Sequence, residues 1–244
     1  MSLTVDFPAV AAAIALALQT APFRVSGASL GSAPVSELLT AHLGADELVL
    51  DGASAGAATD TSVVVSGTIR IAAYGLALLA AEAVFSVADG TAQLQLTLTG
   101  LPAGWRPSVS FPSLRDTVSD AFQYESPALV LDSQNWPLPD DFPVSYGYPA
   151  FAPATRTALT GGLSLRATVS MLQPPAGLSV FAGLTAWTVA GEIGLLGQWA
   201  VLCLRSQPAA APYQIAGYTL PFGLAIVVTV LQPPDGSRPA SWAW

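Results

Sequence analysis

Residues 82–99 read EAVFSVADGTAQLQLTLT and show the clearest secondary-structure pattern in the chain. The apolar residues before Ala88 lead into Asp89-Gly90, a pair that is typical of a tight turn between two strands. Beyond the turn, leucines at 94, 96 and 98 alternate with glutamine and threonine. This period of two predicts one buried and one polar face, so we expect a β-hairpin with its leucines in a core.

The neighbouring segments extend this pattern in both directions. Ser62–Ile71 (SVVVSGTIRI) is rich in β-branched residues and predicts a strand, and residues 73–82 favour a strand through alternation at Leu76 and Leu78. Pro and Gly turns bound further predicted strands, which are Ser108–Phe111, Ala128–Leu131, Ala158–Val169, Leu178–Val189, Gln198–Leu204, Tyr213–Leu220 and Leu224–Leu231.

Two short helices are expected before the strands. Residues 7–19 have apolar residues at helical spacing after Asp6 and Pro8, and Ser36–Leu43 has Ser36 as its expected N-cap. Together these elements predict a mainly β fold, an antiparallel sandwich or a stacked-sheet repeat with one or two short N-terminal helices.

Domain boundaries are suggested by a segment rich in proline and aromatic residues, 133–157. It separates an N-terminal part, 1–132, from an apolar C-terminal part, 158–244, although one continuous domain also fits. Repetition is suggested by LQPP, which occurs at both 172–175 and 231–234. The alternative is that Pro-Pro merely ends a strand at a sheet edge.

Composition excludes much site chemistry. The 244 residues include no lysine, a single histidine (His42) and a single cysteine (Cys203), and only 10% are charged, against about 25% in typical domains. A lysine nucleophile is therefore excluded, and we predict no metal site and no cofactor. The net charge of −8 without a basic run excludes nucleic acid as an expected partner.

Two features of the sequence indicate the cellular compartment of the protein. Cys203 lies in an apolar run and offers no disulfide framework, and the apolar stretch Phe7–Leu18 follows Asp6 rather than a basic region. We read no signal peptide, and the cytoplasm is the favoured compartment.

One catalytic motif has a formal match, the GxSxG of Gly52–Gly56 around Ser54. A hydrolase would require a sharp strand-to-helix turn with an acid and then a histidine later in the chain. His42 precedes Ser54, so a flexible loop between strands is the preferred interpretation and a hydrolase is a weak alternative. His42 itself is expected to be a partly exposed helix residue, unless Asp46, Glu47 or Asp51 folds beside it.

The acidic residues do not form a recognisable site. Neither Asp46-Glu47 with Asp51 and Asp60, nor Asp132 with Asp140-Asp141, has the spacing of a calcium loop. Asp116, Asp120 and Glu125 lie near aromatic residues, and carboxylate pairs for glycoside hydrolysis come together only in the fold. We interpret the first two groups as solvated turn residues and the third as capping and solubilising residues. A non-enzymatic protein is favoured, although an enzyme stays an open alternative.

The C-terminal third is almost free of charge, with none in residues 167–191 or 206–234. This favours a structural or interaction protein that self-associates, or packs on a protein partner, through low-charge β surfaces. The alternative is a binder of lipid or another apolar molecule, or a membrane-active β protein. The candidate ligand-binding residues are then Phe181, Trp187, Trp199, Tyr218 and Phe222.

Overall fold

The computed structural model describes residues 22–115 and 118–134 and, beyond these, the strands 136–137, 158–159, 162–171, 187–193, 199–206, 213–215, 218–220 and 225–231. The chain divides into two compact units, which we describe separately. Unit 1 comprises Met1–Leu101 and Ala128–Asn135, and unit 2 comprises Pro102–Pro127 and Trp136–Trp244.

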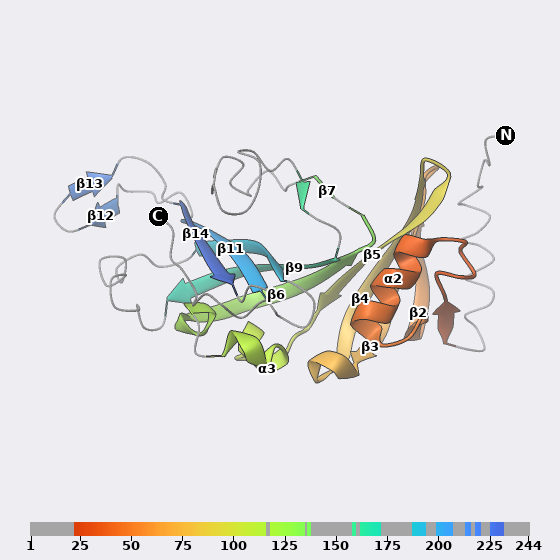
Figure 1. Cartoon of the computed structure of the whole chain (residues 1–244), viewed down its shortest axis with the longest axis horizontal. Helices are drawn as coiled ribbons and strands as arrows, with labels where there is room; N and C mark the ends of the chain where they lie inside the picture. The colour runs from red at the N-terminus through yellow and green to blue at the C-terminus, as the bar shows by residue number, and fades with distance from the viewer. Residues whose placement is uncertain are drawn as a thin grey trace. The chain divides into compact units, whose positions relative to one another are not determined.

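Unit 1 is an antiparallel sheet in which each strand pairs with the next one along the chain (Figure 1). The last strand, β6, enters unit 1 at Ala128 and pairs with β5. Its six strands are β1 (Phe23–Val25), β2 (Leu48–Ala58), β3 (Ser62–Ile71), β4 (Leu76–Ala88), β5 (Thr91–Thr99) and β6 (Phe122–Asp132).

The β4–β5 hairpin confirms the expectation for residues 82–99. Ala88 pairs with Thr91, and the two residues between them, Asp89 and Gly90, both have positive φ, +51° and +75°. A two-residue turn of this kind matches the right-handed twist of the strands. The leucines at 94, 96 and 98 are at most 1% exposed, so the alternation in sequence corresponds to a buried and an open face.

The predicted strand over 73–82 begins later than expected. Residues Ala72–Tyr74 form a short 3-10 helix, η1, and β4 starts at Leu76, where its pairing with β3 is irregular. Leu76 is buried, but Leu78 has φ +58° and is 76% exposed. Leu78 is therefore not a core residue, because the irregularity shifts the alternation by one position.

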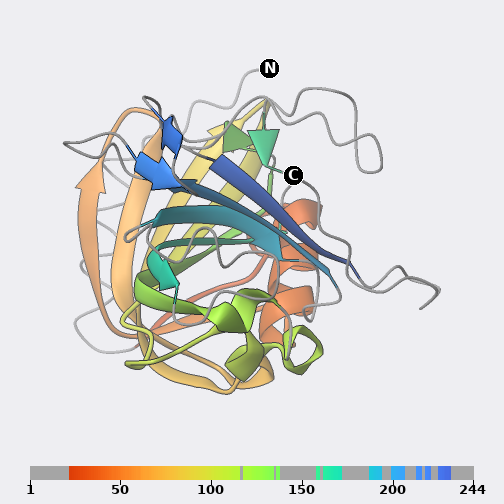
Figure 2. The same cartoon turned by 90° about the vertical axis from the view of Figure 1, so that its left-hand side faces the viewer.

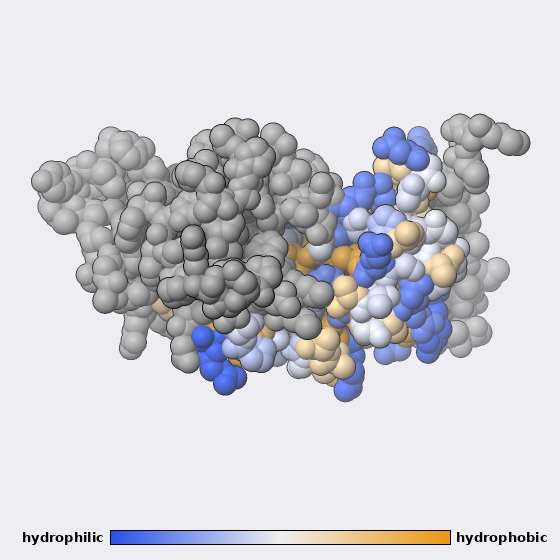
Figure 3. All heavy atoms as spheres, viewed as in Figure 1, coloured by the Kyte–Doolittle hydropathy of each residue, from blue (hydrophilic) through white to orange (hydrophobic). Residues whose placement is uncertain are grey.

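Helix α2 (Ala33–Leu43) confirms the second predicted helix but begins earlier than predicted. Its N-cap is Ser32, whose Oγ accepts a hydrogen bond from the Val35 amide at 3.4 Å, and a proline lies in its first turn. Ser36 is therefore inside the helix rather than its cap. The helix ends at Gly44, which has φ +80°. Figure 3 shows a mixed, mostly hydrophilic to neutral surface over this helix.

Among the secondary-structure elements, α2 packs mainly on β5 and η1 in unit 1. Its buried residues are Val35, Leu38, Leu39 and His42. Because the helix has one apolar side, its position is set by packing on the sheet rather than by intrinsic propensity.

Unit 2 contains a second set of antiparallel strands, in which β9, β10, β11 and β14 are hydrogen-bonded in that order (Figures 1 and 2). Two small pairs, β7–β8 and β12–β13, are also present. The strand bounds are β7 (Trp136–Pro137), β8 (Ala158–Leu159), β9 (Gly162–Met171), β10 (Trp187–Ile193), β11 (Trp199–Ser206), β12 (Tyr213–Ile215), β13 (Tyr218–Leu220) and β14 (Ala225–Leu231).

The strand predicted at Ser108–Phe111 is wrong. Residues Pro107–Ser110 form a short helix, α3, followed by the 3-10 helices η2 (Pro112–Leu114) and η3 (Val118–Ala121). Pro107 has a fixed φ suited to the start of a helix, and the indole Nε1 of Trp105 donates to Ser110 Oγ at 2.9 Å across the turn. The backbone thus turns where an extended segment was expected.

The mainly β, antiparallel class with short helices is confirmed. The sandwich and repeat arrangements stay predictions, as do the domain boundaries at 132 and 157. The predicted helix over 7–19 and the prolines of both LQPP segments lie outside the described residues.

Candidate functional site

The GxSxG motif lies inside strand β2. Its pairing with β3 is irregular between Asp51 and Ser54, and Gly52 has φ +57°. Opposite this bulge, a Cβ on Gly67 would lie 3.0 Å from the Asp51 carbonyl oxygen, a close contact that favours glycine there. The predicted flexible loop is therefore wrong, and the motif is a bulged strand. Since no helix follows Ser54, the strand-to-helix turn of a hydrolase is not formed here.

His42 is buried, not partly exposed as predicted, with 6% of its surface accessible. Its Nδ1 is hydrogen-bonded to the Tyr74 hydroxyl, and burial lowers the pKa of His42 to about 4. Burial also raises the pKa of Tyr74. A buried imidazole bonded to a tyrosine is not placed to activate Ser54, which is exposed on β2.

The acids near His42 have other partners. Asp46 accepts hydrogen bonds from the backbone amides of Gly27 and Ala28, at 2.8 and 3.1 Å. Hydrogen bonds from the Ser36 side chain and these amides hold the pKa of Asp46 below its usual value. Glu47 pairs with Arg24 at 2.9 Å. These acids anchor the turn before α2 and the edge strand β1.

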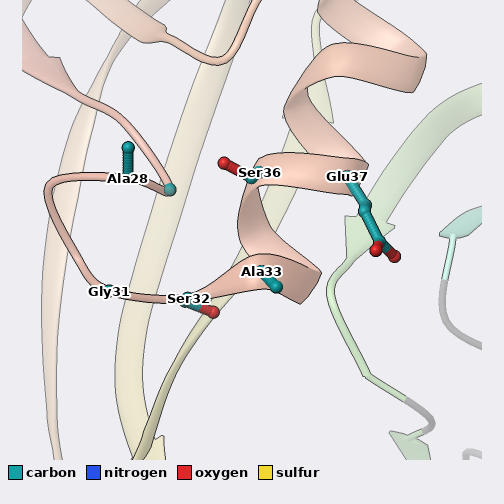
Figure 4. Close-up of a pocket in the computed structure, with 7 residues that line it drawn as sticks. Ala28, Gly31, Ser32, Ala33, Ser36 and Glu37 are labelled. Atoms are coloured by element: carbon teal, nitrogen blue, oxygen red, sulfur yellow. The ribbon is translucent and has the colours of Figure 1, made fainter.

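A shallow pocket of about 360 Å³ lies between the turn that begins at Gly27 and the first turn of α2 (Figure 4). In Figure 4, Ser36 points toward the loop of Ala28 and Glu37 points away from it. Ser32 Oγ, another lining group, already donates to the Ala92 carbonyl at 2.6 Å. The pocket therefore offers small side chains and no converging polar groups, and we assign it no ligand.

Asp132, at the end of β6, is a buried carboxyl group, 8% exposed. Burial raises its pKa to about 6, although a hydrogen bond from the Gln134 amide, at 2.9 Å, acts in the opposite direction. The Gln95 side-chain amide also donates to it, at 3.3 Å. From the sequence, Asp132 is expected to be a solvated turn residue like Asp140 and Asp141. In the structure, Gln95 on β5 covers it instead.

We predict that Asp132→Asn stabilises the protein at pH 7. The folded state holds the Asp132 proton more tightly than the unfolded chain, so its ionisation reduces stability as pH rises from about 4 to about 6. After allowance for solvent screening, the neutral variant should gain about 1 kcal/mol at pH 7. Urea denaturation between pH 4 and pH 7 measures this. A variant with the wild-type pH dependence would contradict the assignment.

Unit 2 contains a polar cluster between α3 and β6. Ser108 Oγ donates to the Asp120 carboxylate, and the Tyr124 hydroxyl donates to the Ser119 carbonyl at 3.2 Å. Burial, and then the negative charge of Asp120, raise the pKa of Tyr124. Glu125 is exposed, and no hydrogen bond between it and Asp120 is found in the described residues. Asp116, the third of the acids singled out in the sequence, lies outside the described residues.

The predicted aromatic ligand-binding set is only partly described. Trp187, Trp199 and Tyr218 begin β10, β11 and β13, whereas Phe181 and Phe222 lie outside the described residues. Trp187 pairs with Ser206, the last residue of β11, and Trp199 is the first. These two tryptophans are therefore about 23 Å apart along the strands, since a strand rises about 3.3 Å per residue.

Unit 2 is distinguished by strand β14, which lies at the edge of its sheet. Among the described residues, β14 has one hydrogen-bonded neighbour, β11, with Val228 opposite Leu202. The strand is seven residues long, reads AIVVTVL and carries no charge. By comparison, the edge strand β1 of unit 1 is three residues long and contains Arg24 in its ion pair with Glu47. Sequence periodicity predicts a strand here but not its place in the sheet.

Comparison with known proteins gives no family: no protein-family description, curated protein or solved structure matches the chain. In the described ranges, no helix is long and apolar enough to cross a membrane. The same residues contain no group of three or more His, Cys, Asp or Glu side chains that could hold a metal ion.

Proposed function

We propose that this protein is a non-enzymatic interaction protein that self-associates, and that two copies pair through strand β14. The proposal rests on one observation, the uncharged seven-residue strand with a single described neighbour. An edge of this kind presents unpaired backbone amides and carbonyls, which are a template for another strand.

The composition of the strand suits pairing with a second copy. Five of its residues are isoleucine, valine or threonine, which favour extended backbone. Two antiparallel β14 strands centred on Val228 place each residue 228 opposite its own copy. The absence of charge on the strand means that no like charges meet, and the pairing forms a closed, two-fold dimer.

The other edge strand is a poor partner for β14. Strand β1 is less than half as long, and its Arg24–Glu47 ion pair is typical of an edge that resists pairing. Pairing of β14 with β1 of another copy would continue without closing and would form a filament. The difference between the edges therefore favours a dimer.

We expect the wild-type chain to be a dimer in size-exclusion chromatography with light scattering. Val228→Lys should raise the dimer dissociation constant by at least about tenfold, or about 1.4 kcal/mol, because two ammonium groups would face each other. Val228→Thr is the matched control, since it keeps the β-branched shape and adds no charge, and it should remain dimeric.

If Val228→Lys does not fold, a second lysine variant in the same strand, Thr229→Lys, replaces it in the chromatography experiment. Circular dichroism and the melting temperature establish that each variant is folded. A wild-type chain that stays monomeric at high concentration would contradict the proposal. A monomer that carries extra mass in native mass spectrometry would instead support the binding of an apolar ligand.

A further inference from the structure

Helix α2 is held on unit 1 by three aliphatic residues and one ionisable residue. Val35, Leu38 and Leu39 are at most 6% exposed, and His42, in the last turn, is equally buried. An aliphatic side chain at this position would bind the helix at any pH. A histidine makes the attachment depend on a proton, because a charged imidazole is costly to bury.

The surroundings of His42 suit the neutral ring. Tyr74, from η1, is its hydrogen-bond partner, and the two rings meet edge to face with centroids 6.1 Å apart. Strand β5, which also packs against α2, has no titratable side chain.

The acids of α2 and of the segment after it do not face the imidazole. Glu37 is exposed, Asp46 is bound to the turn at Gly27, and Glu47 is bound to Arg24. No charged group contributes to the lowered pKa of His42, whose cause is burial. An imidazolium at this place would therefore lack a carboxylate partner among the described residues.

Helix α2 has a glycine with positive φ near each end. Gly31 precedes it and Gly44 follows it, with φ of +63° and +80°. Residues that accommodate large changes of φ and ψ at the ends of an element are typical hinges.

We propose that His42 is an acid-sensitive latch, whose protonation releases α2 from β5 and η1 and uncovers the apolar face that the helix covers. The sign follows from burial: the pKa of His42 is about 4 in the closed state and 6.5, its ordinary value, once the ring is in water. The closed state is thus fully favoured above about pH 6.5 and loses stability as pH falls toward 4.

The expected size of the effect follows from these two values. Between pH 8 and pH 5, the equilibrium constant for opening should rise about 30-fold. Asp132, a buried group of unit 1 whose pKa of about 6 lies within this pH range, has the opposite sign, since its protonation favours the folded state. In a measurement of global stability the two groups would offset each other, so the opening of α2 has to be measured locally.

The test is hydrogen exchange with mass spectrometry on the full chain, with protection factors for residues 33–43 corrected for the intrinsic pH dependence of exchange. Wild-type protection should fall about 30-fold from pH 8 to pH 5. His42→Asn is the matched variant, because its Oδ1 accepts the Tyr74 hydrogen bond near the position of Nδ1 but does not titrate. Its protection should not change. An equal fall in both proteins would overturn the proposal.

A second measurement keeps the test valid if His42→Asn does not fold. His42 is the one histidine of the chain, so its Cε1 proton gives a single imidazole resonance in the NMR spectrum. We expect a midpoint below pH 5, with α2 protection falling as the pH decreases from about 6.5 toward that midpoint. A midpoint near 6.5 with unchanged protection would overturn the latch.

Discussion

Gly27→Ala should lower the free energy of unfolding by about 3 kcal/mol, because the alanine has no space. A Cβ at this position would lie 2.2 Å from the Ser36 backbone nitrogen and 2.5 Å from its Cα. Neither atom belongs to a flexible side chain, so the whole first turn of α2 would have to move. That movement would also break the hydrogen bond from the Gly27 amide to Asp46.

The matched control is Gly31→Ala in the same turn. Gly31 has φ +63°, but nothing lies within 4 Å of a Cβ placed there, so the cost is backbone strain alone, about 1 kcal/mol. Urea denaturation of the full chain, followed by circular dichroism, compares the two variants. Equal losses of stability would show that Gly27 does not pack against α2.

Phe111→Ala is expected to cost about 4 kcal/mol. The Phe111 side chain is fully buried between α3 and η2, and its removal leaves a cavity in unit 2 that the short helices around it cannot fill. The loss has no polar component, so it should be the same at pH 5 and pH 8.

Val109→Ala is the control for Phe111, since Val109 lies in α3, two residues before Phe111, and is 65% exposed. It should change stability by less than about 0.5 kcal/mol. Thermal unfolding, followed by tryptophan fluorescence, measures both variants. A loss below about 1 kcal/mol for Phe111→Ala would contradict a packed core in residues 102–127.

Local pattern was sufficient for β3 and for the β4–β5 hairpin, but not for β1 or for the part of β2 that was expected to be a loop. The hairpin follows from alternation and from the Asp89-Gly90 turn, and β3 follows from its β-branched residues, all of which are signals between residues close in the chain. Alternation does not predict helix α3, since this pattern carries no information on turns. The proline at its start and the Trp105–Ser110 hydrogen bond determine the turn there.

The candidate sites depended on distant contacts and were less predictable. His42 is buried by Tyr74, which is 32 residues away, and Asp132 is covered by Gln95, 37 residues away. The edge position of β14 is a matter of strand order, which periodicity does not encode. The GxSxG motif is a local pattern that misleads. Its five residues match a catalytic motif in sequence, but in the structure they are part of strand β2, whose bulge accounts for the first glycine, Gly52.

The late arrival of β6 in unit 1 has a consequence during synthesis of the chain. Strands β1 to β5 pair with their sequence neighbours and can assemble as they leave the ribosome. The partner of β5 ends at Asp132, 33 residues beyond Thr99. At about 5–20 residues per second, the edge of β5 stays open for about 2–7 s. A nascent chain therefore passes through a period in which another nascent chain can occupy the place of β6, and crowding of ribosomes on one message would increase that competition.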